Sequence, residues 1–510
     1  MKPSNELFKL IKSLTKSEKR FFKLSSSLQS GDKNYLKLFD YIEKQEVYDE
    51  EEVKKYFKEE RFIQHLPSEK NHLYKLILKS LRSFYSEQSV SSILKQELKN
   101  IEILFKKALY KECEKFVRKA KKIAIEHEKF YYWFELLAWE KKLLEEAYES
   151  GEFDLDVDKL IREEEEVIAK LRNLAEYQIL YSKINYVFRR GGFTRNEAEK
   201  KVVDDIANYH LIKGKNTAIS TRATTICYYI KGLCSATNRD YADSYVFFNK
   251  VKTILDGNTK IREDLAKRYL LTLSHLLRCY IDSSDYENAT KLIGEIRALE
   301  GKKGFGNMGV MVKIFAVSYS FEITLYNLIG DFNKSVDLIP QLEKQMELYG
   351  DKLNKEQIIT FSFLKAYSYF GLGEFKKALH ELNEVLNDNE QLLRQDLYAF
   401  ARLLNLMIHY ELENYEFLSY IIKSTNRYIN KTERDYTIEN YLIKQLKKLV
   451  KAPSHAAKTE IFERMEQDME VLLNNPQERV VLEYFDLPAW VQSHLKHIPM
   501  SEVIRERLKA

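Results

Sequence analysis

The strongest constraint on the fold of this chain is the distribution of its helix-breaking residues. It contains 7 prolines in 510 residues, and none of them lies between Pro67 and Pro340. Glycine is also scarce, at 16 residues, where average composition would give about 36 glycines and about 25 prolines. A sheet-rich chain would need many more turn residues over this length. We therefore predict an all-α fold, and the length favours several domains or an elongated repeat over one compact core.

The stretch from Phe363 to Val385 shows how such helices would pack. It predicts two short helices joined by a tight turn at Gly371 and Gly373, with the Phe375 side chain packed into the turn. Small and apolar residues recur at helical spacing on the sides that would face each other: Ala366 and Tyr369 before the turn, then Ala378, Leu382 and Val385. The stretch therefore predicts a helical hairpin with a close helix crossing.

The second-helix pattern of this hairpin recurs along the chain. An aromatic residue is followed at helical spacing by a small, a bulky and an apolar residue, and from Tyr241 the copies are 45, 46, 43 and 40 residues apart. The copies start at Tyr110, Tyr241, Tyr286, Phe332, Phe375 and Tyr415. In the preceding helices, Gly232, Leu277 and Ala366 share a small or apolar slot, and Tyr280, Tyr326 and Tyr369 share an aromatic one.

These slots resemble those of the tetratricopeptide repeat (TPR) family. The resemblance covers residues 225–430 well and 92–225 loosely. The steps exceed the family's repeat of about 34 residues, and the family's terminal proline and first-helix tryptophan are missing. The resemblance implies a right-handed α-solenoid of divergent repeats whose usual role is to bind other proteins.

The pattern divides the chain into four predicted parts. A capping box at Thr15–Glu18 and helical periodicity up to residue 88 indicate a separate N-terminal bundle. We interpret the next region as degenerate repeats. It would contain a charged helix over 143–172, a hairpin closed by Gly191–Gly192 and a helix over 196–211. Prolines cut the end of the chain into short helices that would cap the open face of a repeat stack. The predicted parts are a bundle (1–90), degenerate repeats (91–225), TPR-like repeats (226–450) and a C-terminal helical cap (451–510).

Charge gives only weak support for nucleic-acid binding. The formal net charge is +5, from 82 Lys and Arg against 77 Asp and Glu, and the first 30 residues account for that excess. A second basic stripe would lie on one helix at Lys75, Lys79 and Arg82, but the connection Glu60–Pro67 is long for a helix-turn-helix. A solvated bundle is the preferred interpretation of this region. The alternative is a peptide-sensing regulator whose basic N-terminal bundle contacts nucleic acid.

The sequence favours a non-enzymatic protein without metal or cofactor. Residues Gly304–Gly309 match GxGxxG, the dinucleotide-binding motif. Because this motif follows a predicted helix rather than a strand, we expect an inter-repeat loop. His494 and His497 have no cysteine or carboxylate nearby to complete a metal set. Four cysteines without a CxxC pair, no apolar core for a signal peptide and no uninterrupted apolar run of about 18 residues predict a cytoplasmic location without membrane binding. Cys234 and Cys279 share one repeat slot, which favours a packing role.

The TPR resemblance implies a peptide groove along the concave face formed by the first helices. By register it implies Tyr229, Arg278, Ser320, Thr324, Asn327, Phe363, Tyr367 and Met407 as groove residues. Only Arg278 and Asn327 approach the pattern of a carboxylate clamp, so the mixed, aromatic wall suits an apolar segment or an amphipathic helix. Each aromatic residue could instead pack between helices. The first hypothesis is therefore a scaffold that binds a protein or peptide segment, with the partner and the oligomeric state left open.

Overall fold

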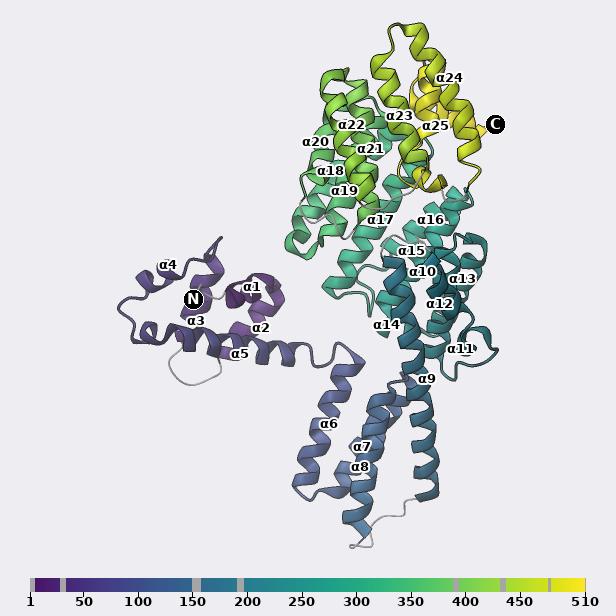
Figure 1. Ribbon diagram of the computed structural model, residues 1–510. Helices are drawn as coiled ribbons and strands as arrows, with labels where there is room; N and C mark the ends of the chain where they lie inside the picture. Colours follow the sequence, from purple (N-terminus) through teal and green to yellow (C-terminus); the bar gives the residue numbers. More distant parts are fainter. Residues whose placement is uncertain are drawn as a thin grey trace. The chain divides into compact units, whose positions relative to one another are not determined.

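The structure is a computed structural model that describes residues 5–27, 34–148, 157–189, 197–388, 394–431, 437–475 and 478–509 (Figure 1). Within these ranges every regular element is a helix, which confirms the predicted all-α class. The chain forms two compact units, Met1–Ile168 and Ala169–Ala510. They are considered one at a time.

The first unit begins with a small helical bundle. Its core contains Leu38, Phe39, Ile42, Leu73 and Ile77, all fully buried. The predicted capping box is confirmed, because the Thr15 N–H donates to Glu18 Oε2 at 2.6 Å and the Glu18 N–H donates to Thr15 Oγ1 at 3.3 Å. The bundle comprises α1 (Glu6–Ser13), α2 (Lys16–Ser27), α3 (Asn34–Lys44), α4 (Glu50–Tyr56), η1 (Arg61–His65) and α5 (Leu66–Phe84).

Three further helices, α6 (Val90–Lys106), α7 (Tyr110–Glu126) and α8 (Phe130–Tyr148), pack in sequence after the bundle. Ion pairs join them to the start of the next helix. Lys121 bridges Glu140 at 2.7 Å and Glu163 at 2.9 Å, and Lys141 pairs with Glu164 at 2.6 Å. Part of the acidic run Glu163–Glu166 is therefore used within this unit rather than offered to a basic partner.

The region after α8 differs from the prediction of a charged helix followed by a hairpin. α9 runs from Val157 to Arg189 as a single helix and includes the residues assigned to that hairpin. No glycine or proline interrupts this range, so nothing in it stops helix propagation. The predicted helix over 196–211 forms as two pieces, α10 (Glu197–Ala207) and α11 (His210–Lys213). The Gly191–Gly192 turn lies outside the described residues.

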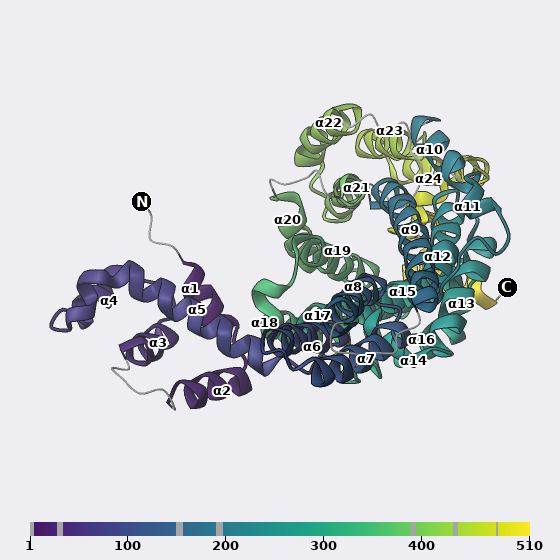
Figure 2. The same ribbon diagram turned by 90° about the horizontal axis from the view of Figure 1, so that it is seen from below.

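The second unit continues as a series of helix pairs, called here the helix stack. Each helix packs on the next, and from α15 onward the first helix of each pair also packs on the first helix of the following pair. Figure 2 shows α15, α19 and α21 on the inner side of their partners α16, α20 and α22. The stack contains α12 (Thr221–Thr237), α13 (Tyr241–Asp256), α14 (Thr259–Asp264), α15 (Ala266–Asp282), α16 (Tyr286–Arg297), α17 (Met308–Leu328), α18 (Phe332–Tyr349), η2 (Gly350–Lys352), α19 (Lys355–Gly371), α20 (Phe375–Leu386), α21 (Gln395–Glu411), α22 (Tyr415–Lys431), α23 (Thr437–Lys451) and α24 (His455–Leu472).

The turn inside each pair has the same geometry in every copy of the sequence pattern. The six aromatic residues that start the pattern are each the first residue of a helix. In each copy the N–H of the residue before the aromatic donates to the carbonyl five residues earlier, at 2.8 to 3.0 Å, as expected for a helix ended by a left-handed residue. That left-handed residue is Ala108, Arg239, Ser284, Gly330, Gly373 or Glu413. Because only two of the six are glycine, glycine alone would not reveal the repeat.

Small residues lie where the helices cross most closely, as predicted. A Cβ added to Gly371 would lie 2.3 Å from the Phe332 ring, and one added to Gly232 would lie 2.8 Å from the Phe248 ring. Ala378, Leu382 and Val385, the predicted seam of the second helix, are fully buried. The Gly232 contact lies within the α12–α13 pair, and the Gly371 contact joins α19 to α18 of the preceding pair, so small residues set helix distances both within and between pairs.

Among the described residues, α17 alone is long and apolar enough to cross a membrane by length and composition. It nevertheless carries Lys313 and Glu322. It packs against α15, α16, α18 and α19, and half of its most apolar window is buried. Its position at the centre of the helix stack accounts for its composition.

Candidate functional site

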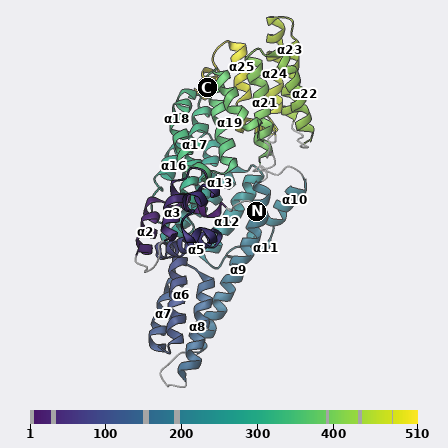
Figure 3. The same cartoon turned by 90° about the vertical axis from the view of Figure 1, so that its left-hand side faces the viewer.

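The residues predicted to line a groove come from α12, α15, α17, α19 and α21, and their face of the stack is called here the first-helix wall. The end of the chain lies against this wall. This C-terminal segment comprises η3 (Glu478–Glu483), α25 (Leu487–Lys496) and α26 (Met500–Lys509). α25 packs on α24 (Figure 3), and α26 packs on α25.

One contact between the C-terminal segment and the wall is a carboxylate that forms ion pairs with two arginines. The Glu483 carboxylate forms an ion pair with Arg278 of α15 and a second with Arg239, at 3.5 Å. Arg239 is the left-handed residue of the α12–α13 turn, so two helix pairs contribute to the same carboxylate. Arginine suits this role because its planar fork matches a carboxylate.

The neighbouring Tyr484 lies in an aromatic site. Its ring stacks on Phe400 of α21 at 4.1 Å between centroids and meets Phe363 of α19 edge-on at 5.9 Å. Its hydroxyl donates to Asp396, which also accepts from Arg394 Nη2 at 2.8 Å. Burial alone would raise the pKa of Asp396, but the Arg394 guanidinium and the Tyr484 hydroxyl hold that pKa below its ordinary value.

Two further contacts hold α25. The backbone N–H of Asp486 donates to the Tyr367 hydroxyl of α19 at 2.8 Å. The Trp490 indole Nε1–H donates to Glu411 Oε1 of α21 at 2.6 Å, and His494 Nε2 lies 2.8 Å from the same oxygen. Trp490 is buried and its ring meets Phe462 of α24 edge-on. The segment is therefore bound by polar and aromatic groups together.

The two ends of the segment extend the contact along the stack. The Glu478 carboxylate accepts from the N–H groups of Thr437 and Ile438 at 2.9 and 2.8 Å, which caps the start of α23. At the other end, the Ser501 carbonyl lies against Gly330, so closely that a Cβ at that glycine would be 2.7 Å from it. The segment thus contacts the stack from the α12–α13 turn to α24.

The eight predicted groove residues divide into two sets. Arg278, Phe363 and Tyr367 contact the C-terminal segment. The environments of the other five are as follows: Tyr229 is buried with its hydroxyl 3.0 Å from His275 Nε2, Asn327 accepts from Ser335 and Ser368 between helices, Met407 is fully buried, Ser320 donates to its own helix, and Thr324 is half-buried on α17.

Sequence reasoning missed several residues of this wall. The apolar character of the C-terminal tail was visible in Tyr484, Phe485 and Trp490, but no local pattern said where the tail would dock. Asp396, Arg394 and Arg239 belong to no repeat slot that the pattern defines. Their roles depend on a partner up to 244 positions away in the chain, in the case of Arg239 and Glu483.

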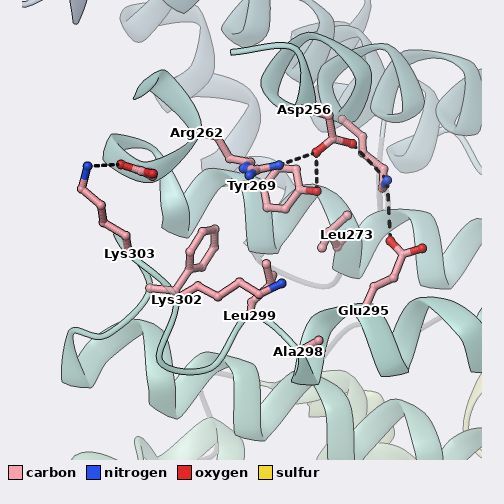
Figure 4. A pocket seen from close by; sticks show the side chains of 12 residues that line it. Asp256, Arg262, Tyr269, Leu273, Glu295, Ala298, Leu299, Lys302 and Lys303 are labelled. Atoms are coloured by element: carbon pink, nitrogen blue, oxygen red, sulfur yellow. Dashed lines mark hydrogen bonds and ion pairs between the residues drawn. The ribbon is translucent and has the colours of Figure 1, made fainter. Parts of the chain in front are cut away.

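A separate cavity of about 410 Å³ adjoins the glycine-rich loop (Figure 4). The loop lies between α16 and α17, which confirms that GxGxxG follows a helix. Gly304 has φ +83°, and a Cβ there would be 2.5 Å from the Glu263 carbonyl, so the loop packs closely on α14. Glycine is needed there for backbone conformation and close packing.

The charged groups of this cavity pair with one another. Asp256 accepts from the Tyr269 hydroxyl at 2.7 Å, from Arg262 at 3.0 Å and from Lys252 at 3.1 Å (Figure 4). Burial opposes ionisation, but these donors hold the pKa of Asp256 below its ordinary value, so this carboxylate is a weak base. Lys303 pairs with Glu263 at 3.1 Å. The cluster joins α13, α14 and α15 and provides no activated nucleophile.

Two cysteines of the second unit also act in packing. Cys234 and Cys279 are buried, and burial raises the thiol pKa to about 12 and about 11, respectively. Across the described ranges, no group of three His, Cys, Asp or Glu side chains could hold a metal ion. A reactive thiol needs the opposite environment, with partial exposure and a lowered pKa.

A scan against protein-family models gives no match for this chain, and a search of curated proteins finds no significant relative. Inference about its function therefore rests on the sequence and the geometry of the wall.

Proposed function

We propose that this protein is a non-enzymatic, TPR-like scaffold that binds a segment of another protein along its first-helix wall. The observation that carries the proposal is that this wall already holds one protein segment, the end of its own chain. Glu483, Tyr484 and Asp486 are each bound by residues from different first helices. A surface that binds a segment through side chains at repeat intervals is typical of peptide recognition by helical repeats.

The bound segment also indicates how the wall recognises a ligand. Arginines hold a carboxylate, aromatic rings enclose a tyrosine and a tyrosine hydroxyl accepts a backbone N–H. Each of these groups recognises a feature common to many peptides, so recognition needs no cofactor or metal. The half-buried residues Thr324 and Phe321 of α17 extend the wall on which a partner could lie.

We further propose a cytoplasmic location and no membrane association. The supporting observation is that the four cysteines are free and buried, a pattern typical of a reducing compartment.

A matched pair of variants tests the proposal. Thr324→Arg places a long cation on the first-helix wall, whereas Thr290→Arg makes the same change on the exposed side of α16. The full chain and both variants are used for quantitative affinity purification from native lysate. We expect proteins that are retained by the wild type and by Thr290→Arg but lost with Thr324→Arg. Recovery of no protein, or of the same proteins with all three chains, would contradict a binding role for the wall.

A second candidate function, contact with nucleic acid, is favoured by a feature of the N-terminal bundle. Tyr41 and Tyr56 stack at 4.2 Å beside a cavity of about 620 Å³, and Tyr56 is 65% exposed. Three lysines and three acids also line this cavity: Lys37, Lys44, Lys58, Asp40, Glu59 and Glu60. Exposed aromatic rings with nearby lysines can stack bases. Binding of a fluorescent single-stranded oligonucleotide at low salt, weakened by Tyr56→Ala, would support this candidate. Equal signals from wild type and variant would remove it.

A further inference from the structure

The long helix α9 carries an apolar row that its own chain leaves exposed (Figure 1). Its exposed large apolar side chains are 49% to 65% exposed. At about 100° of rotation per residue they all lie within about 40° of one another around the helix, and an exposed alanine lies in the same sector. This row, called here the α9 stripe, consists of Val157, Ile161, Ile168, Ala175, Ile179 and Tyr186.

The stripe is separate from the faces of α9 that pack inside the molecule. Leu160 and Val167 are buried in the first half of the helix, and Tyr177 and Ile184 are buried in the second half. All four lie at least about 80° from the centre of the stripe. Single exposed apolar residues are normal on a protein surface, whereas a row aligned along about 45 Å of one helix is a contiguous apolar face.

The spacing of the stripe is that of a helix-pairing seam. Its residues follow one another at steps of four, seven, seven, four and seven residues. Apolar residues at such steps line the side of a helix that packs against another helix in a coiled coil. Charged residues, such as Glu165 and Arg172, fill some of the intervening seam positions. The stripe therefore suits a weak, reversible pairing with another helix.

The charges beside the stripe indicate which helix pairs with it. Glu165 and Lys183 are both exposed on the same edge of the stripe, the acid in the first half of α9 and the lysine in the second half. Among the described residues, neither side chain forms an ion pair. An antiparallel pair of α9 helices brings these edges together with opposite charges facing, whereas a parallel pair would set Glu165 beside the acidic run Glu163–Glu166 of the second copy.

One register satisfies the stripe and the charges together. If Ile168 lies opposite Ile179 of the second copy, Ile161 lies opposite Tyr186, because each step forward along one antiparallel helix is a step backward along the other. In the same register the acid and the lysine come within one residue of facing each other. Two-fold symmetry then repeats every contact once, so a few matched pairs cover the whole stripe.

We propose that the α9 stripe binds the α9 stripe of a second copy of this chain, which forms a weak antiparallel homodimer. The inference goes beyond the scaffold function and does not depend on it, because α9 contributes no residue to the first-helix wall. It assigns an occupant to the one long helix of the described chain whose exposed apolar residues form a continuous seam.

Sedimentation velocity of the full chain tests the dimer, at concentrations from about 1 to about 100 µM because a small, partly polar interface associates weakly. The wild type should pass from monomer to dimer. Ile168→Lys removes one apolar contact from each copy and should weaken the association at least about 100-fold. Ala169→Lys is the matched control: it adds the same cation at an exposed position about 100° from the centre of the stripe and should leave the association unchanged.

Charge exchange tests the facing pair of charges. Glu165→Lys and Lys183→Glu should each weaken the dimer about 3- to 10-fold, and the double variant Glu165→Lys/Lys183→Glu should restore it to the wild-type level. Thermal unfolding followed by circular dichroism checks that all variants fold alike, as expected for substitutions at exposed positions.

A spin label measures the orientation of the two helices. A nitroxide on Asp158→Cys, at an exposed position near the start of α9, is attached to the native chain, whose own cysteines are buried. Pulsed electron paramagnetic resonance should give about 45 Å between the two labels of an antiparallel dimer, against about 10 to 15 Å for a parallel one.

Three outcomes would overturn the proposal. They are a monomer at every concentration, a dimer that Ile168→Lys leaves intact, and the short label distance of a parallel pair. Flotation of the wild type, but not of Ile168→Lys, with phosphatidylcholine vesicles and without dimer formation would assign the stripe to a membrane surface instead. None of these results bears on the scaffold function, which the Thr324→Arg comparison decides separately.

Discussion

Replacing Arg394 with methionine should destabilise the second unit strongly. The methionine side chain has nearly the volume of the aliphatic part of the arginine side chain. The main change is therefore the loss of the guanidinium beside Asp396. Asp396 is 4% exposed and accepts from Arg394 through Nε at 3.0 Å and Nη2 at 2.8 Å. Without Arg394, the Tyr484 hydroxyl is the one side-chain donor to this carboxylate that remains among the described residues. An uncompensated buried charge costs about 3–5 kcal/mol, which is the expected loss in free energy of unfolding.

The loss should depend on pH. In the wild type the pKa of folded Asp396 is below its ordinary value, so its stabilising contribution is complete above the unfolded pKa and is lost as the pH falls through the folded pKa. In the Arg394→Met variant, burial without the guanidinium raises the folded pKa, so protonation then favours the folded state. The difference between the two chains should therefore be largest at neutral pH and should narrow toward about pH 4.

Urea unfolding followed by Trp490 fluorescence measures this change locally. Trp490 contacts the C-terminal end of α21 through Glu411, and the other tryptophans, Trp133 and Trp139, lie in the first unit and can be replaced by phenylalanine. The double variant Arg394→Met/Asp396→Leu removes both charges and should recover most of the lost stability. A loss below about 1 kcal/mol in the single variant, or no recovery in the double variant, would refute the reasoning.

Three other substitutions or reagents test packing. Gly371→Ala should lower the free energy of unfolding by about 1–3 kcal/mol because its Cβ would meet the Phe332 ring, whereas Gly294→Ala, with open space around it, should be neutral or stabilising by up to about 1 kcal/mol in the same thermal assay. The four buried thiols should resist maleimide at pH 7 until the chain is unfolded, and labelling of the native chain would contradict their burial and raised pKa values.

Much of the fold could be predicted from sequence because its determinants are local. The absence of proline and glycine over long ranges fixed the helical class, and the aromatic residues at positions such as Tyr241 and Phe332 mark helix starts. The capping box at Thr15 was predicted for the same reason, since its donors and acceptors lie three residues apart. Helix starts, seams and close crossings follow from periodicity and side-chain size.

The site was less predictable because its determinants are distant in the chain. The register gave Arg278, Phe363 and Tyr367, but the repeat pattern cannot say which surface is covered by a later segment. Asn327 shows the limit of register alone, because it occupies a predicted groove slot and yet hydrogen-bonds between helices with Ser335 and Ser368.

The most direct test of the wall as a binding surface is hydrogen–deuterium exchange of the full chain with and without a protein that the affinity purification recovers. The bound protein should slow exchange in α15 and α17, in particular around Thr324, while the outer helices α16 and α18 exchange at unchanged rates. Protection confined to α16, α18 or the N-terminal bundle would contradict the assignment of the first-helix wall as the site of partner binding.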